Sequence, residues 1–179
     1  MSKKENLSQS LLKELIYYNP DTGLFTWKLR DRRFFETDRS FNSWNHTYPG
    51  TKAGKRSINE YEKIMILGKR YASHRLAFLY VFGYMPDLVD HINGDIVDNR
   101  IKNLREATHS QNGHNKKKPI NNSSGFKGIS WSKQQKKWEA HITINRKRIR
   151  IGFFKDKQEA VSTIIAERQK MVGDFANNK

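Results

Sequence analysis

The sequence predicts an α+β fold made of two small parts that are joined by a polar linker. Only 36% of the 179 residues are hydrophobic, which suits small cores better than one large core. Residues 116–125 are basic and then small and polar, which is the composition of a linker. Beyond it, residues 125–179 contain segments in which apolar and polar residues alternate, followed by a segment with apolar residues at helical spacing. This part is therefore expected to be a three-stranded antiparallel sheet packed on one helix.

The first part is expected to begin with a helix and a short strand. Residues 7–18 carry leucines at helical spacing and predict the helix. Residues 19–23 have the composition of a turn, and residues 24–27 predict a strand after it. Residues 29–57 are polar, aromatic and irregular, which predicts a long surface loop.

A hairpin and a second helix are expected next. Residues 61–72 predict a hairpin around Gly68, and residues 74–84 predict a short apolar helix that ends near Gly83. The following segment, 88–115, holds most of the residues that could carry chemistry.

The second part is expected to contain strands at residues 128–132, 137–144 and 147–153 and a helix at 157–172. Asp156 and Glu159 stand at capping-box spacing, and Gly173 marks the end of the helix. Alternation in the second strand places on the apolar face Trp138, Ala140 and Ile142. The apolar stripe of the helix is expected to comprise Ala160, Val161, Ile164, Ile165 and Val172.

Charge and composition restrict the class of partner. The formal net charge is +16 and the sequence pI is about 10.1, which favours binding to a polyanion such as nucleic acid. From Ser110 onward, sixteen Lys and Arg stand against five Asp and Glu. There is no cysteine, so a metal would need oxygen or imidazole ligands. No apolar run suits a signal peptide or a membrane span, and the expected location is cytoplasmic.

An Asp-His pair provides the first candidate for catalysis. Asp90 and His91 follow an apolar pair at the end of an expected strand, and Asn93-Gly94 predicts a tight turn after them. A histidine with a near-neutral pKa can deprotonate a water molecule. A carboxylate can hold a divalent metal, which stabilises charge on the leaving oxygen of a phosphodiester. Taken alone, the pair would more often be a capping Asp beside a surface His.

The wider pattern resembles the HNH nuclease family, in the form found in phage and intron-encoded homing endonucleases. The matching residues are His74-Arg75, Val89-Asp90-His91, Asn93-Gly94, Asp98-Asn99-Arg100, Asn103-Leu104-Arg105 and Ser110-Gln111-Asn112. The resemblance covers about residues 8–116, and it implies a phage or bacterial host cell as the location. It implies a ββα-metal motif of two strands, a loop and a helix around one divalent ion.

The resemblance also implies roles for individual residues. His91 is expected to act as the general base, and Asp90 and Asn112 are expected to hold the metal. Asn103 is expected to fix the loop by hydrogen bonds. An amide oxygen suits Mg²⁺ or Mn²⁺ rather than zinc.

Four further residues in or near this pattern have other expected roles. His109 is an alternative metal ligand on the same helix face as Asn112, and His74 is expected to be structural. Arg100 and Arg105 are expected to face DNA phosphates.

Residues 125–175 resemble the DNA-binding domain of plant ethylene-response factors. The matching residues are Gly125–Trp131, Lys137–Ala140, Ile149–Phe154 and Glu159-Ala160. The resemblance implies that the sheet contacts DNA through Lys127, Trp131, His141, Arg148 and Arg150. The basic run Lys116, Lys117 and Lys118 is expected to follow phosphates.

These observations predict an N-terminal HNH nuclease domain at residues 1–116, with its ββα-metal core at about 86–116, a linker at 117–124 and a DNA-binding domain at 125–179. The expected function is site-specific, metal-dependent cleavage of double-stranded DNA, by a monomer on DNA or by a dimer. Two alternatives are a DNA-binding regulator with a degenerate HNH fold and an RNA-binding protein. The regulator would need no metal, and the RNA-binding protein would need more exposed aromatic residues than this sequence offers.

Overall fold

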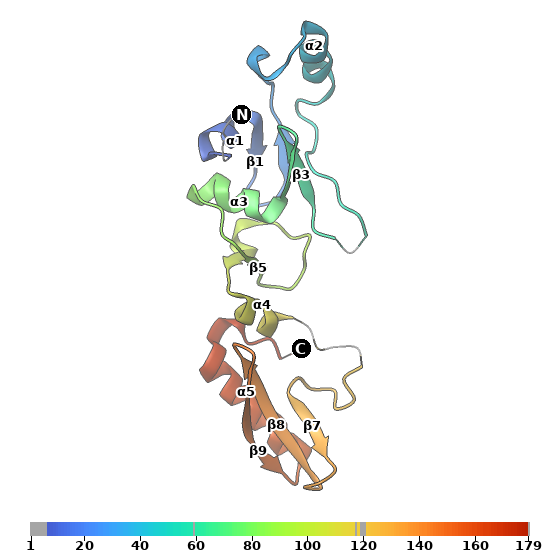
Figure 1. Cartoon of the computed structure of the whole chain (residues 1–179), viewed down its shortest axis with the longest axis vertical. Coiled ribbons are helices and arrows are strands. Elements are labelled where there is room, and N and C mark those ends of the chain that lie inside the picture. The colour runs from blue at the N-terminus through green and yellow to red at the C-terminus, as the bar shows by residue number, and fades with distance from the viewer. Residues whose placement is uncertain (1–6, 59, 117, 119–120, 179) are drawn as a thin grey trace. The chain divides into compact units, whose positions relative to one another are not determined.

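The computed structural model describes residues 7–58, 60–116, 118 and 121–178. It divides the chain into two compact units, residues 1–106 and 107–179 (Figure 1). The division falls before the helix that carries Asn112, whereas the sequence-based domain boundaries assign residues 107–116 to the first domain. Those boundaries therefore stay a prediction. No helix in the described part of the chain is both long and apolar enough to cross a membrane.

The first unit consists of short helices and three antiparallel strand pairs, β1 with β2, β3 with β4 and β5 with β6. Its elements are α1 (Gln9–Leu15), β1 (Ile16–Tyr18), β2 (Phe25–Trp27), η1 (Arg32–Phe34), α2 (Asp38–Thr47), β3 (Lys63–Ile66), β4 (Lys69–Ala72), α3 (Ser73–Phe82), β5 (Val89–His91), η2 (Ile101–Asn103) and β6 (Leu104–Glu106).

The expected first helix is shorter than the sequence suggests. The Ser8 hydroxyl accepts a hydrogen bond from Leu11 N and caps the helix, which ends at Leu15. Ile16 is extended and begins β1, so residues 16–18 form a strand rather than the last turn of a helix. Ile16 is fully buried. A buried Ile is expected here both for the last turn of a helix and for the start of a strand, so helical periodicity alone could not distinguish the two.

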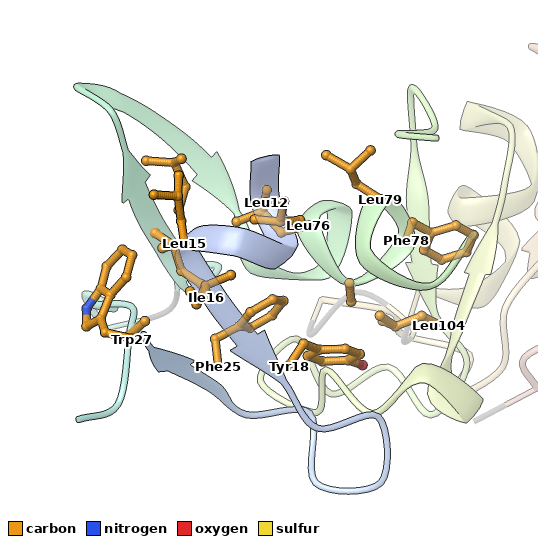
Figure 2. Packing of buried hydrophobic residues seen from close by; sticks show 14 of the residues in the cluster. Leu12, Leu15, Ile16, Tyr18, Phe25, Trp27, Leu76, Phe78, Leu79 and Leu104 are labelled. Atoms are coloured by element: carbon orange, nitrogen blue, oxygen red, sulfur yellow. The ribbon is translucent and has the colours of Figure 1, made fainter. Parts of the chain in front are cut away.

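Side chains from α1, β1, β2 and α3 converge to form the core of the first unit (Figure 2). The rings of Tyr18 and Phe25 lie 4.6 Å apart, and both side chains are almost fully buried. Tyr18 also donates from its hydroxyl to the carbonyl oxygen of Asn99, at 2.7 Å. The core thereby holds one end of the loop that follows β5.

The expected long loop at residues 29–57 contains a helix. Thr37 caps α2 by accepting from Ser40 N, and Trp44 on α2 meets Trp27 edge-on at 5.4 Å. The expected hairpin and second helix are present as β3, β4 and α3, and α3 ends at Gly83, which has φ +82°.

The second unit contains the expected three-stranded antiparallel sheet, in the order β7-β8-β9, and one long helix. Its elements are α4 (His109–Asn115), β7 (Ile129–Ser132), β8 (Lys137–Ile144), β9 (Lys147–Phe154), α5 (Lys157–Val172) and η3 (Gly173–Phe175). Ala140 and Ile142 are buried against α5, as the alternation predicts.

The buried face of α5 differs from the expected stripe at three positions. Ile165 is 39% exposed, so its assignment to the core is wrong, and Val172 at the end of the helix is only half-buried. Arg168, by contrast, is only 4% exposed. Arg168 is one turn beyond buried Ile164 and donates to the carbonyl oxygen of Lys127 at 2.7 Å. This hydrogen bond gives the buried guanidinium a partner that a polarity pattern does not reveal.

Candidate active site

Asp90 and His91 lie side by side on β5, which is buried at all three of its residues. The strand pairs antiparallel with β6 and places Asp90 opposite Arg105 and His91 opposite Leu104. Asp90 is 4% exposed and His91 is 3% exposed. The two strands and the loop between them hold these polar side chains inside the first unit.

The loop that joins β5 to β6 is fixed by Asn103. Its Oδ1 accepts from Asn93 N at 3.0 Å, and its Nδ2 donates to the carbonyl oxygen of Asp98 at 2.8 Å. Asn93 Nδ2 also donates to Asp98 Oδ2, and Gly94 takes the turn with φ +73°. Asn103 thus has the contacts that a loop-fixing residue requires.

His91 is oriented by an amide and by two rings. Its Nε2 lies 3.2 Å from Asn99 Oδ1, and because an amide oxygen only accepts, the neutral ring donates from Nε2. The proton-accepting nitrogen is then Nδ1. The ring stacks on Tyr61 at 5.8 Å and meets His74 edge-on at 5.2 Å. Neither Tyr61 nor Asn99 was assigned a site role from the sequence, because their contacts with His91 are tertiary.

Burial determines the charge of the two histidines. It lowers the pKa of His91 below the usual value, although the hydrogen bond to Asn99 and nearby carboxylates act in the opposite direction. Burial lowers the pKa of His74 further, to about 3, and repulsion from His91 and Arg75 adds to this effect. Both imidazoles are therefore neutral at pH 7, which is the form that a general base requires.

Asp90 is engaged by Arg105. Its Oδ2 accepts from Arg105 Nε at 2.9 Å and lies 2.8 Å from Nη2. Asp90 and Asn112 offer the hard oxygen donors that Mg²⁺ and Mn²⁺ prefer, so the chemistry of this pair fits either ion. The described residues contain no group of three or more His, Asp or Glu that could hold a metal. Asn112 lies half-buried on α4, in the second unit.

The two arginines expected to face phosphates pair with carboxylates in this structure. Arg105 contacts Asp90, as above, and its side chain is only 16% exposed. Arg100 donates through Nε to Asp98 Oδ1 at 2.7 Å, and these contacts with Arg100 lower the pKa of Asp98 to about 2. Arg100 remains partly accessible, whereas Arg105 belongs to the buried site.

The exposed face of the second unit's sheet carries three of the expected DNA contacts. Arg148 and Arg150 project from β9, and each lies 3.1 Å from a carboxylate oxygen of Glu139. Arg148 also contacts His141 Nδ1 at 3.2 Å. This face is thus a hydrogen-bonded group around Glu139 rather than a row of independent cations. Trp131 is 49% exposed but lies on the opposite face of the sheet, where it pairs with Trp138 and meets its ring edge-on.

The described lysines that were expected to contact DNA lie outside the group around Glu139. Lys127 donates to the carbonyl oxygens of His114 and Asn177, at 2.7 and 3.1 Å, and burial lowers its pKa to about 8. It therefore ties segments of the second unit together rather than presenting a free cation. Lys116 is exposed, and Lys118 donates to the carbonyl oxygen of Gly125 at 3.0 Å. Lys117 lies outside the described residues.

Comparison with known proteins identifies the domain that holds the site. The HNH endonuclease family model matches residues 71–114, a range that includes Asp90, His91, Asn103 and Asn112. The HNH domain therefore lies in the middle of the chain and not at its N-terminus. None of the comparisons supports an ethylene-response-factor-type domain at residues 125–179.

A relative of the chain is known from a bacteriophage. Protein 3.8 of Escherichia phage T7 is 36% identical over 88 residues, which are 49% of this chain and 72% of the phage protein. No solved structure matches the chain. The chain therefore belongs to the family of phage T7 Protein 3.8 and contains an HNH endonuclease domain at residues 71–114.

Proposed function

We propose that this protein is a metal-dependent DNA endonuclease that uses His91 as its general base. The observation that carries the proposal is the placement of His91, which is buried next to Asp90 and lies with Nε2 3.2 Å from Asn99 Oδ1. Burial lowers its pKa and so favours the neutral ring. Its Nδ1 can then take a proton from the water that attacks the scissile phosphate. The HNH domain and the net charge of +16 support DNA as the substrate.

Asp90 and Asn112 are the residues that would hold the metal, with Mg²⁺ or Mn²⁺ as the ion. When bound, such an ion supplies positive charge that stabilises the leaving oxygen. Asn103 holds the loop, and so keeps Asn99 in place to orient the His91 ring. Site-specific cleavage of the homing type would further require a surface that reads sequence.

The second unit is proposed to supply that surface. Arg148, Arg150 and His141 lie on the exposed face of its sheet, and exposed Lys116 precedes that sheet in the chain. Trp131, which is exposed at the edge of the other face, is the fourth proposed contact. An arginine on such a sheet can read a guanine edge in the major groove. Binding through this unit would raise the local concentration of the cutting site on the same DNA.

A non-cleaving regulator is the second candidate, and one contact favours it. Arg105 already neutralises Asp90, so the carboxylate is compensated without a metal. A regulator would keep this ion pair and bind DNA intact, whereas an endonuclease must let a metal share or replace it.

Cleavage of supercoiled plasmid separates the two candidates. The protein is incubated with plasmid in Mg²⁺, in Mn²⁺ and in EDTA, and a library of randomised DNA is included so that an absent target does not decide the result. Nicked circle in metal but not in EDTA is the expected outcome for a monomer, and prompt linear product would indicate a dimer. Intact DNA in every tube, together with a clear gel shift, would establish the regulator instead.

A further inference from the structure

The first unit contains a groove that has no part in the chemistry described above. It has a volume of about 890 Å³ and is formed by residues of β2, α2, the segment 51–57 and the β3–β4 hairpin. Its basic lining residues are Arg30, Lys52, Lys55, Arg56, Lys63 and Arg70, and its aromatic ones are Trp27, Trp44 and Tyr48. Glu60 is the one acidic residue among the described residues that line it.

Arg30 lies in the wall of this groove between two tryptophans. Its guanidinium carbon is 3.7 Å from the ring centroid of Trp44 and 4.9 Å from that of Trp27, which is at the edge of the hydrophobic core (Figure 2). Asn45 fixes the backbone here, because it accepts from Arg30 N and donates to Arg30 O, both at 2.9 Å. The stack orients a planar cation that is built into the fold.

The charge of Arg30 is not compensated by the described part of the protein. Its Nε and Nη2 are buried and have no hydrogen-bond partner there. A buried donor without a partner costs free energy, and an anion in the groove would offset part of this cost by its attraction to the guanidinium charge. Burial lowers the pKa of Arg30 to about 10, so the side chain is still charged at pH 7.

The other cations of the groove fall into two groups. Lys52 and Lys63 are paired with Glu62 and Glu60, at 2.9 and 3.2 Å. Lys55, Arg56 and Arg70 are exposed and make no ion pair or side-chain hydrogen bond with any described residue. The groove therefore keeps several positive charges available for an external anion.

The groove is close in the chain to the candidate active site. Tyr61 stacks on His91, and Lys63, two residues later, lines the groove, so the two positions are separated by at most about 7 Å of chain. Ser73 N also donates to the carbonyl oxygen of Glu62 at 2.9 Å, which joins the start of α3 to this segment. A long anion that lies in the groove would therefore be held by the same hairpin that leads to His91.

We propose that this groove binds the phosphate backbone of the duplex that the enzyme cuts. The inference rests on the proposed function for its choice of DNA. Several cations along one groove suit a polymer of phosphates better than a single small anion, because each phosphate neutralised releases counterions. The tryptophans hold Arg30 in place, and the exposed Tyr48 offers a surface for the sugar. These contacts carry no base information, so they position the DNA without reading it.

The test is DNA binding by the full chain in EDTA, with a fluorescent 30-base-pair duplex of arbitrary sequence and a series of salt concentrations. The variant Arg56→Gln/Arg70→Gln removes two groove charges. The matched control is Arg39→Gln/Lys69→Gln, which removes two exposed charges that do not line the groove and includes the strand neighbour of Arg70. The groove variant should bind about tenfold more weakly at low salt. Its plot of log affinity against log salt should also be less steep, with a negative slope that is smaller in magnitude by about 2. The control should change affinity by less than about twofold.

Three outcomes would overturn the proposal, the third measured with a single-stranded RNA of the same length. Equal weakening in both variants would show only a loss of net charge, and an unchanged salt slope would remove the groove from the interface. A greater loss for single-stranded RNA than for duplex DNA would assign the groove to RNA instead. Because binding is measured without metal, this test does not depend on cleavage. If the groove variant loses affinity but the wild-type protein never cuts plasmid, the nuclease proposal is wrong and the groove is still a DNA-binding site.

Discussion

Arg105 and Asp90 form a buried salt bridge across the β5–β6 pair, with Nε and Nη2 of the arginine both directed at Oδ2 of the aspartate, at 2.9 and 2.8 Å. The two residues are direct partners in the strand register. The carboxylate proposed to bind a metal is therefore already neutralised by a side chain on the neighbouring strand. Metal and arginine should compete for it or share it.

Replacement of Arg105 by Met should reveal this competition. Without the guanidinium, buried Asp90 loses its ion pair with Arg105, so we expect a loss of about 3 kcal/mol in the free energy of unfolding when no metal is present. Mg²⁺ should restore part of that stability, and thermal melting with and without Mg²⁺ measures it. The double variant Asp90→Asn/Arg105→Met is the control, because it removes both charges and should lose less. A variant as stable as the wild type in EDTA would show that the pair contributes little.

Replacement of His91 by Ala should separate cutting from binding. Loss of a general base lowers a rate by about 10²–10⁴-fold, whereas phosphate contacts elsewhere are untouched. Plasmid nicking in Mg²⁺ and gel shift in EDTA measure the two properties. The control is His46→Ala, since His46 is exposed on α2. Cleavage at the wild-type rate by the His91 variant would show that another group is the base.

His74 should make the fold sensitive to acid. Its pKa is lowered to about 3 in the folded protein, first by burial, while the unfolded chain titrates near 6.5. Below pH 6.5 the unfolded chain binds a proton that the folded chain does not, so stability is present above 6.5 and is lost as the pH falls. Between pH 7.5 and pH 5 this histidine should cost about 2 kcal/mol.

Urea unfolding at pH 7.5 and pH 5 measures that loss. His74→Phe keeps a ring against Tyr61 but cannot titrate, so the difference between the two pH values should be smaller in the variant. His91 shifts in the same direction, so some dependence should remain. An identical pH dependence in wild type and variant would contradict the burial argument.

Glu139 should restrain the positive charge of the second unit's sheet. It pairs with Arg148 and Arg150, and although burial raises its pKa, these arginines outweigh that effect and keep the pKa below the usual value. Glu139→Gln should therefore release two arginines and tighten binding to arbitrary duplex DNA about threefold at low salt. Glu167→Gln on α5 is the control for loss of one negative charge, because Glu167 pairs with Lys170 instead. Equal tightening in both variants would mean that only net charge matters.

Local signals explain which parts of the fold were predictable. The bounds of α5 agree with the sequence because Asp156 caps its first turn and Gly173 ends it. The alternation in β8 correctly places Ala140 and Ile142 in the core. These features depend on neighbours within a few residues, so the sequence records them directly.

Long-range contacts explain what was missed. The segment 29–57 was expected to be an irregular loop, but it contains α2. This helix is held in place by Trp44, which contacts Trp27 and Arg30. Both partners precede Trp44 by more than ten residues, so a pattern read over a few neighbouring residues does not reveal the contact. Likewise, the pairing of Arg105 with Asp90 follows from strand register, and the sequence offered only two opposite charges fifteen positions apart. The expected metal pair of Asp90 and Asn112 stays a prediction.

The turn at Asn93-Gly94 has a consequence for the chemical lifetime of the protein. An Asn-Gly step deamidates when the glycine nitrogen attacks the asparagine side-chain carbonyl carbon. Here Gly94 N donates to the carbonyl oxygen of His91 at 2.8 Å, and Asn93 is held at both ends of its amide, by Asp98 and by Asp95 N. The attack therefore requires the loop to open, so this step should age slowly while the loop stays closed. Deamidation would replace the Asn93 donor to Asp98 by a carboxylate, and so would loosen the loop from which Asn99 orients the proposed catalytic base.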